Sequence, residues 1–187
     1  MPKVDQRHLD ARRAQILTGA RRAFAKYGYD RATVVRLEEA TGLSRGAIFH
    51  YYADKKDLFV AVAGEVTRQL RGTIRESGFA GGLREIANTD PDLLAVLVET
   101  DTRFRHDEDF VQRMRAVSAD AGPERSQWWE EQVASGALRT DVEWQQLARF
   151  SAVVMNGLAY LVASGSTDGM DLDALVRLLE DALRPQN

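Results

Sequence analysis

The residues with the most specific chemistry lie close together, in residues 33–55, which read TVVRLEEATGLSRGAIFHYYADK. Arg45 carries a guanidinium that can donate two hydrogen bonds to the edge of a guanine in the major groove of DNA. Its neighbours Ser44, Gly46 and Ala47 are small, which lets the backbone approach another molecule closely. This combination is typical of a helix that reads base edges in double-stranded DNA.

Two short helices joined by a tight turn would position these residues. Thr33 is a good N-cap for a first helix, and Gly42 supplies the backbone freedom that the turn requires. Ser44 is a good N-cap for a second helix, which we expect to reach Phe49 or Tyr51. Apolar residues on both helices can close a contact that fixes the angle between them. The segment therefore predicts a helix-turn-helix.

Thr33 and Lys55 are the candidates for binding the DNA backbone. Each lies at the N-terminal end of a predicted helix, where free N–H groups and the positive end of the helix dipole attract a phosphate. Phosphate contacts position a protein on DNA and make binding salt-dependent, whereas base contacts set the sequence preference. The candidate DNA-binding residues are Thr33, Arg36, Ser44, Arg45, Gly46, Ala47, Phe49, His50, Tyr51 and Lys55.

Helical periodicity extends along most of the chain, and the alternation typical of strands is absent from the sequence. A first helix is expected over about residues 9–27, ending at Gly28, and Asp54 caps a long fourth helix that includes Leu70. The predicted fold class is therefore all-α. Further helices are expected near residues 82–88, 91–105, 107–119, 123–136, 144–162 and 172–183, with a turn at 165–169 between the last two.

Charge is divided unevenly along the sequence. The net charge is −3, but residues 1–60 hold 12 Lys and Arg against 7 Asp and Glu, a charge of +5, and the rest hold 13 against 21, a charge of −8. A basic part joined to an acidic remainder favours a nucleic-acid-binding domain attached to a second domain. We assign residues 1–55 to DNA binding and residues 56–187 to a second, helical domain, with the fourth helix as a continuous connection.

Other functional classes have little support. No cysteine is present, and no apolar run reaches the roughly 20 residues that span a bilayer. The polar N-terminal residues lack the apolar core of a signal peptide, so we expect a cytoplasmic protein with no membrane partner. No Gly-rich phosphate loop or nucleophile elbow is present, which argues against an enzyme. The three histidines are far apart, and the acidic run at 106–109 is more typical of a helix start than of a metal site.

The stretch from Ile16 to Phe59 resembles the N-terminal DNA-binding domain of TetR-family transcriptional regulators. The resemblance rests on the spacing Phe24-x3-Gly28-Tyr29, on the triplet ATV and on the run LEEATGLSRGAIFHYYADK, in the same order as in the family. Within the family, the segment RLEEATGLSRGAIFH is similar to the corresponding segment of the actinobacterial aconitase-repressor branch. Two positions depart from the usual pattern, because the family usually has tyrosine at Phe49 and alanine at Glu38.

The resemblance implies an all-helical homodimer with two DNA-binding domains, a palindromic operator and an inducer bound in the C-terminal domain. It places Thr33 and Lys55 on phosphates, residues 44–47 at the front of the recognition helix, and residues 49–51 on the DNA backbone or bases. We therefore expect a ligand-responsive transcriptional regulator that acts as a repressor. The alternative is a helix-turn-helix regulator that is controlled by a protein partner and has no small-molecule ligand.

Candidate effector-binding residues are polar or amphipathic side chains that interrupt otherwise apolar helical faces. The alternative for each of them is a surface position or a dimer contact. In the aconitase-repressor branch the effector would be a tricarboxylate with a divalent metal. Glu180 would supply a carboxylate ligand for that metal. Basic residues to meet several carboxylates are sparse in this region, so the composition does not support a citrate-like effector. The candidates are Glu99, Arg103, Trp128, Asn156 and Glu180.

The last two predicted helices mix small and bulky apolar residues, which allows helices to approach closely. This pattern predicts a four-helix interface between two copies of the chain. The alternative is that the same residues belong to the core of a single chain. The candidate dimer residues are Ala148, Ser151, Met155, Leu158, Ala159, Val162, Leu175 and Leu179.

Overall fold

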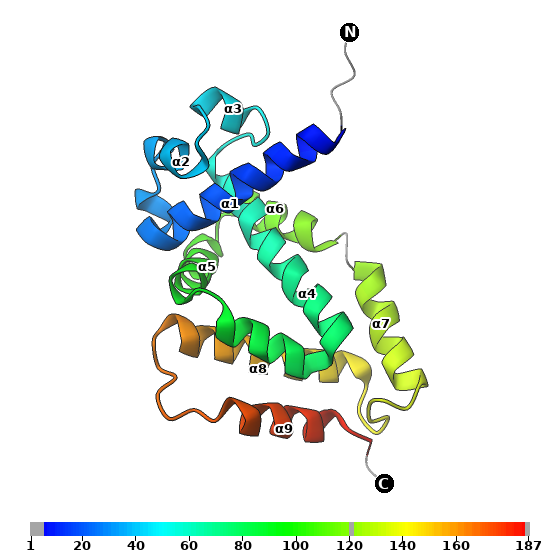
Figure 1. The fold of residues 1–187 in the computed structure, drawn as a ribbon. Helices are drawn as coiled ribbons and strands as arrows, with labels where there is room; N and C mark the ends of the chain where they lie inside the picture. The colour runs from blue at the N-terminus through cyan, green and yellow to red at the C-terminus, as the bar shows by residue number, and fades with distance from the viewer. Residues whose placement is uncertain (1–5, 120–121, 186–187) are drawn as a thin grey trace. The chain divides into compact units, whose positions relative to one another are not determined.

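The computed structural model describes residues 6–119 and 122–185, and within these ranges the regular structure consists of helices only (Figure 1). The chain forms two compact units. Unit 1 contains the residues up to Val66 together with Asp90–Val117, and unit 2 contains Thr67–Thr89 together with the residues from Ser118 onward. The all-α class expected from the sequence is confirmed.

Unit 1 is built on a core that α1 shares with its neighbours. α1 packs against α2 and α5, and its apolar face contributes Ile16 and Phe24, both fully buried. The ring of Phe24 meets Phe59 of α4 edge to face, with 5.1 Å between centroids. The helices that contribute to unit 1 are α1 (Gln6–Arg31), α2 (Val34–Thr41), α3 (Arg45–Phe49), α4 (Lys55–Asn88), α5 (Pro91–Phe104) and α6 (Glu108–Ala119).

The core of unit 1 extends beyond the N-terminal residues. Leu93 and Val96 of α5 and Phe110 of α6 are buried in the same apolar cluster as Phe24 and Phe59. The boundary of the compact unit is therefore not at residue 55. The DNA-binding segment expected from the sequence shares its core with the later helices α5 and α6. The functional division into residues 1–55 and 56–187 stays a prediction.

Among the described residues, unit 2 contains the C-terminal part of α4, the last two residues of α6 and three further helices. α8 packs against both α7 and α9, and its residues Leu147, Leu158 and Val162 are buried within the unit. The turn between the last two helices contains Gly165 (φ 65°) and Gly169 (φ 75°), as the glycine-rich sequence there predicts. The three helices are α7 (Gly122–Ala134), α8 (Trp144–Ala163) and α9 (Leu172–Leu183).

α4 connects the two units as one chain segment, and the continuous fourth helix expected from the sequence is present. The division between the units falls after Val66, inside the helix. Gly78 has a left-handed φ of 66°, so α4 is kinked there and continues to Asn88. The helix expected near residues 82–88 lies in the second helical stretch of α4, after this break at Gly78.

Arg139, in the loop between α7 and α8, forms hydrogen bonds with the C-terminal end of α9. Its backbone N–H donates to the carbonyl of Leu183 at 2.9 Å, and its guanidinium donates to the carbonyl of Ala182 at 3.2 Å. The same guanidinium pairs with Asp141 at 2.6 Å, which lowers the pKa of that carboxyl group. These contacts satisfy carbonyls that the end of a helix leaves without partners.

Candidate nucleic-acid interface

The helix-turn-helix is set by local capping contacts at the positions expected from the sequence. Thr33 is the N-cap of α2, where its Oγ1 accepts the N–H of Arg36 at 3.5 Å. Gly42 ends α2 in the left-handed region (φ 70°), and Ser44 caps α3 by accepting the N–H of Ala47 at 3.4 Å. Each cap uses only neighbouring residues, which is why the sequence predicts it.

Apolar and close backbone contacts hold α2 and α3 in place. Leu37 of α2 and Ile48 of α3 are fully buried in the core of unit 1. The hydroxyl of Thr41 donates to the carbonyl of Leu37 at 2.8 Å and accepts the N–H of Leu43 at 3.2 Å, so this buried polar group is satisfied. The angle of α3 is therefore fixed by both the core and the turn.

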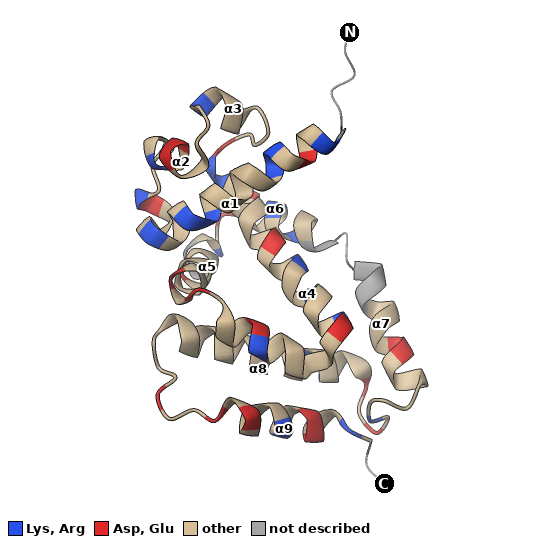
Figure 2. Ribbon diagram, viewed as in Figure 1, with Lys and Arg blue, Asp and Glu red and all other residues tan. Residues whose placement is uncertain are grey.

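The front of α3 is open to solvent and polar. Ser44, Arg45, Gly46 and His50 are exposed, and a Cβ placed on Gly46 would meet no atom within 4 Å. Figure 2 marks Lys and Arg positions in blue along the ribbon of α1 and on α2 and α3. An exposed arginine among small residues, on a short helix within a basic region, is the arrangement that lets a helix enter a major groove.

Gly46→Ala tests whether the front of α3 contacts DNA without disturbing the fold. In the free protein the added methyl group meets nothing, and alanine favours a helix over glycine by roughly 0.5–1 kcal/mol. We therefore expect an unchanged or slightly higher melting temperature together with weaker DNA binding, measured by thermal unfolding and by fluorescence anisotropy with a labelled duplex. Unchanged affinity would show that the front of α3 keeps clear of the DNA.

The residues at the end of α3 are divided between the core and the surface. Phe49 and Tyr51 are half-buried against the core of unit 1, whereas His50 is exposed, with its ring edge to face with Tyr51 at 5.3 Å. The burial of Phe49 fits an apolar side chain without a hydroxyl. Contacts of these three residues with DNA stay predictions.

Two of the expected DNA-binding cations are held by the end of α1 in this structure. Lys55 donates through Nζ to the carbonyls of Tyr29 (3.0 Å) and Asp30 (3.3 Å) and lies 4.5 Å from the centroid of the Tyr29 ring. Arg36 donates to the carbonyl of Arg31 at 2.8 Å, with its guanidinium 4.2 Å from the centroid of the Tyr27 ring. Gly28 (φ 73°) breaks the helical backbone of α1 just before these carbonyls, so the contacts are charge-assisted hydrogen bonds to the turn that follows, supported by cation–π contacts with aromatic rings. Their phosphate contacts stay predictions.

The start of α4 is fixed by reciprocal capping. Asp54 accepts the N–H of Asp57 at 2.7 Å, and Asp57 accepts the N–H of Ala53 at 2.9 Å. This arrangement is similar to a capping box, except that Asp57 accepts the N–H of the residue before the N-cap Asp54. The sequence predicts the cap at Asp54 but not the return contact from Asp57.

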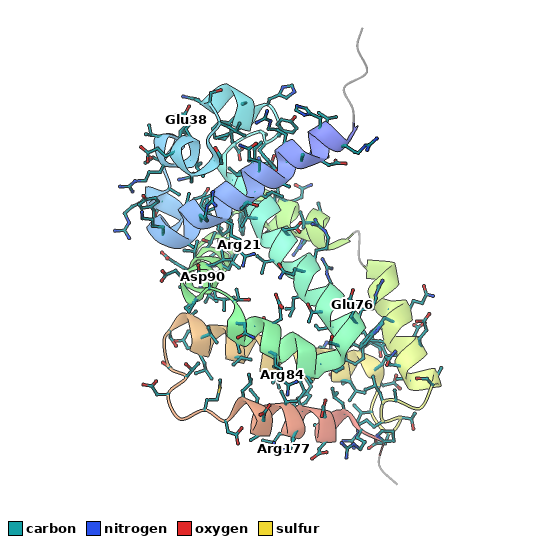
Figure 3. All side chains as sticks on the ribbon, viewed as in Figure 1. Arg21, Glu38, Glu76, Arg84, Asp90 and Arg177 are labelled. Carbon is teal, nitrogen blue, oxygen red and sulfur yellow. The ribbon has the colours of Figure 1, made fainter. Side chains whose placement is uncertain are left out.

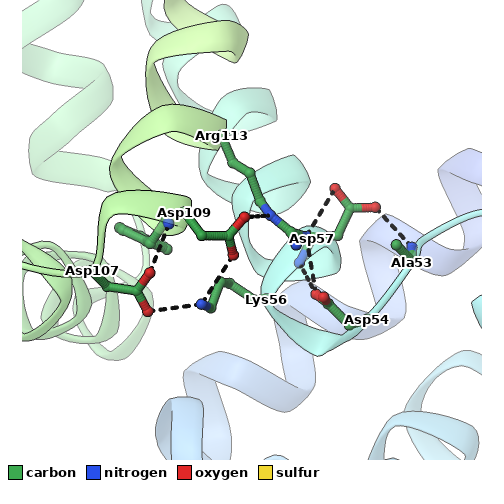
Figure 4. A network of polar contacts seen from close by, with 8 residues as sticks. Ala53, Asp54, Lys56, Asp57, Asp107, Asp109 and Arg113 are labelled. Atoms are coloured by element: carbon green, nitrogen blue, oxygen red, sulfur yellow. Dashed lines mark hydrogen bonds and ion pairs between the residues drawn. The ribbon is translucent and has the colours of Figure 1, made fainter.

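A network of ion pairs joins this cap to α6 within unit 1 (Figure 4). Lys56 contacts Asp107 at 2.7 Å and Asp109 at 3.1 Å, and Arg113 contacts Asp109 at 2.9 Å and Asp54 at 3.2 Å. The hydrogen bond from Lys56 holds the pKa of Asp107 below its usual range, and that from Arg113 does the same for Asp109. Both acids are therefore ionised at neutral pH.

The acidic run at residues 106–109 therefore works as a helix start and an ion-pair partner. Asp107 accepts the N–H of Phe110 at 3.0 Å, which caps α6, while its second oxygen binds Lys56. In the described part of the chain, no group of three or more His, Asp or Glu side chains is arranged to hold a metal ion.

The candidate effector residues lie on four different helices. Glu99 is exposed on α5, Asn156 is exposed on α8, and Glu180 is exposed on α9. Trp128 of α7 is half-buried, with its ring edge to face with both Phe79 (5.7 Å) and Trp129 (5.3 Å). Arg103 falls in α5, outside the residues whose side chains the structure describes. The role of all five residues stays a prediction.

The candidate dimer residues divide into buried and half-buried groups. Ala148, Ala159 and Leu175 are half-buried. The other five are buried within the single chain, in the core of unit 2, and a dimer contact by any of the eight stays a prediction. These five are Ser151, Met155, Leu158, Val162 and Leu179.

Comparison with known proteins identifies the family. Residues 16–62, which include the helix-turn-helix, match the family described as bacterial regulatory proteins, tetR family. Over 98% of its length, the chain is 41% identical to the HTH-type transcriptional repressor Rv1474c of Mycobacterium tuberculosis, of which 99% is covered. The chain belongs to the TetR family.

Further matches agree with membership of the TetR family. The HTH-type transcriptional repressor AcnR of Corynebacterium jeikeium is 38% identical, with 98% of each chain covered. A TetR-family regulator from Rhodococcus sp. has a TM-score of 0.72 at 17% identity, covering 91% of this chain and 95% of that one, which shows that the fold is shared. The resemblance seen in the sequence is thus confirmed, and this TetR-family protein is a transcriptional repressor and not an enzyme.

Proposed function

We propose that this repressor binds a palindromic operator as a homodimer and leaves it when an effector binds within residues 56–187. The observation that carries the dimer is an apolar surface on α8 and α9, called here the dimer surface. Val153, Leu178 and Tyr160 have exposed fractions of 70%, 67% and 59% in the single chain, and Phe150 and Leu161 are also exposed. Large contiguous apolar surfaces of soluble proteins mark interaction sites.

A second copy of the chain is the occupant that fits the dimer surface best. α8 is long and apolar enough to cross a membrane by length and composition alone. However, one side of α8 packs in the core of unit 2, where the Ser151 hydroxyl donates to the Leu147 carbonyl at 2.9 Å. A helix with one face in its own core and a second apolar face outside suits an isologous helical interface. We expect the dimer in the bacterial cytoplasm, where the operator lies.

Dimerisation explains why the operator would be palindromic. A two-fold axis repeats the recognition helix, so two half-sites are read in opposite directions, about 34 Å apart for helices that enter successive major grooves. In each half-site Arg45 would read a base edge, while Thr33 and Lys55 would bind phosphates. For Lys55 this requires exchanging the carbonyls of Tyr29 and Asp30 for a phosphate oxygen.

An effector would act by favouring one orientation of the DNA-binding helices over another. Ligands shift such an equilibrium only by their difference in affinity for the two states. α4 runs without a break from Lys55 to Gly78 and carries residues of both units, which supports it as the element that the effector biases. Candidate contacts are Glu99, Arg103, Trp128, Asn156 and Glu180, and a citrate-like ligand with a divalent metal, which the resemblance to the aconitase-repressor branch implies, is one effector to test.

Selection of DNA in vitro tests this proposal. The chain is mixed with a library of random duplexes, the bound fraction is sequenced, and the protein alone is examined by sedimentation velocity. We expect an inverted repeat with half-sites about one helical turn apart, and a dimer at micromolar concentration. A direct repeat or a single half-site, or a monomer at this concentration, would overturn the proposal.

A ligand screen then distinguishes an effector from a protein partner. Thermal unfolding is measured with tricarboxylates plus Mg²⁺, lipophilic cations and acyl-coenzyme A, since a ligand at 100 times its Kd stabilises the folded state by about 2.7 kcal/mol. Stabilisation accompanied by release from the selected duplex supports a small-molecule effector. If no compound releases the duplex, the alternative of control by a protein partner is favoured.

A further inference from the structure

Glu38 makes a contact that its position in the sequence did not suggest. Its Oε1 accepts the backbone N–H of Arg45 at 2.6 Å, so a side chain of α2 binds the first residue of α3 (Figure 3 labels Glu38). The backbone of the same residue also closes α2, because the Glu38 carbonyl accepts the N–H of Gly42 at 2.8 Å. Glu38 thus binds both the end of the first helix and the start of the second.

The Arg45 N–H is a donor that α3 itself cannot satisfy. The first N–H groups of a helix have no partner within that helix, and α3 has only 5 residues. The Ser44 side chain accepts the N–H of Ala47, and the Glu38 carboxylate accepts the N–H of Arg45. A carboxylate forms a shorter and stronger hydrogen bond than a neutral acceptor does. The direction in which Arg45 leaves the helix therefore depends on a side chain of α2.

We infer that Glu38 is a specificity-determining positioning residue for operator recognition. It touches no base, but it fixes the backbone from which Arg45 projects, and a base edge is read by a bidentate side chain only when that backbone is in register. The inference rests on the proposed docking of α3 in the major groove.

Four variants of the full-length chain test the inference. Glu38→Ala removes the acceptor, Glu38→Gln keeps a neutral acceptor of the same shape, and Arg45→Ala removes the side chain that Glu38 positions. Glu39→Ala is the matched control, since Glu39 is exposed on the same helix and its loss changes the charge equally. Affinity is measured for the selected operator, for single-base variants of it and for a scrambled duplex, and thermal unfolding is measured alongside.

The expected pattern is loss of discrimination with rescue by glutamine. Arg45→Ala lowers the preference for the selected base at one operator position by about tenfold. Glu38→Ala lowers the preference at the same position by a similar factor. Glu38→Gln retains most of the discrimination, and Glu39→Ala retains all of it. In the Arg45→Ala background, Glu38→Ala has little further effect on that position, because the reading side chain is already absent.

The outcomes separate the inference from the docking on which it rests. If Arg45→Ala leaves all base preferences unchanged, the proposed docking of α3 is wrong. If Arg45→Ala relaxes a position and Glu38→Ala does not, the docking stands and the inference is overturned. If Glu38→Ala and Glu38→Gln weaken operator and scrambled duplex equally, or if Glu38→Ala relaxes discrimination no more than Glu39→Ala, a role in positioning is likewise excluded.

Discussion

Gly19→Ala lowers the free energy of unfolding of unit 1 by about 1–3 kcal/mol and weakens DNA binding with it. A Cβ at residue 19 would lie 2.6 Å from the Cα of Thr41 and 2.7 Å from the carbonyl oxygen of Ala40. Both are backbone atoms at the end of α2, so no side-chain rotation relieves the clash. Relief requires that α1 and α2 move apart.

This movement would also break polar contacts between α1 and the end of α2. Gln15 donates to the Thr41 carbonyl at 2.9 Å, and Arg22 donates to the Ala40 carbonyl at 2.8 Å. Because Thr41 precedes the turn into α3, its displacement shifts the recognition helix. We therefore expect the loss of operator affinity to exceed the loss at a scrambled duplex.

Gly72→Ala is the matched control for Gly19→Ala. Gly72 is exposed in α4, and a Cβ there would meet nothing within 4 Å, so alanine adds about 0.5–1 kcal/mol of helix stability. Thermal unfolding of both variants measures the difference. Equal melting temperatures for the two variants would contradict the close packing of α1 on α2.

Val153→Asp is expected to convert the proposed dimer into a monomer and to weaken operator binding by about 100-fold or more, because two linked half-site contacts would become independent. Val153 is the most exposed large apolar residue among those whose side chains the structure describes, and a dimer would bury its side chain. An unpaired carboxylate is strongly disfavoured in an apolar interface. Sedimentation velocity measures the monomer, and anisotropy with the selected duplex measures the affinity.

Two further variants make this result specific to the dimer surface. Leu178→Asp places the same charge on α9 and is expected to act as Val153→Asp does. Gln112→Asp adds one negative charge at an exposed position of α6 and is expected to remain a dimer. Dimers in both aspartate variants of α8 and α9 would show that the interface lies elsewhere.

The sequence predicted the parts of the interface that depend on neighbours in the chain. Thr33, Gly42 and Ser44 cap or end helices through contacts within five residues, so their roles follow from residue type and spacing. The all-helical class follows in the same way, since helical periodicity is local. The contact from Glu38 to Arg45 spans seven residues and a turn, and no sequence rule predicts it.

The sequence did not predict which apolar residues of α8 are buried and which are exposed. Met155 and Leu158 are buried while Val153 and Tyr160 are exposed, although all four are apolar and belong to one helix. A helix that is apolar on two sides has no single face that periodicity can assign to the core. The partners of Lys55 were missed for a related reason, because the carbonyls of Tyr29 and Asp30 lie 26 and 25 residues earlier in the chain and are brought close only by folding.

The extreme shortness of α3 makes DNA recognition inseparable from folding. A helix of 5 residues is only slightly longer than one turn, and isolated helices shorter than about 12 residues are marginal in water. The recognition helix therefore exists only while α1, α2 and α4 hold it in the core of unit 1. A copy of the chain that is emerging from the ribosome, or is being degraded, retains its basic charge but has no means of selecting the operator.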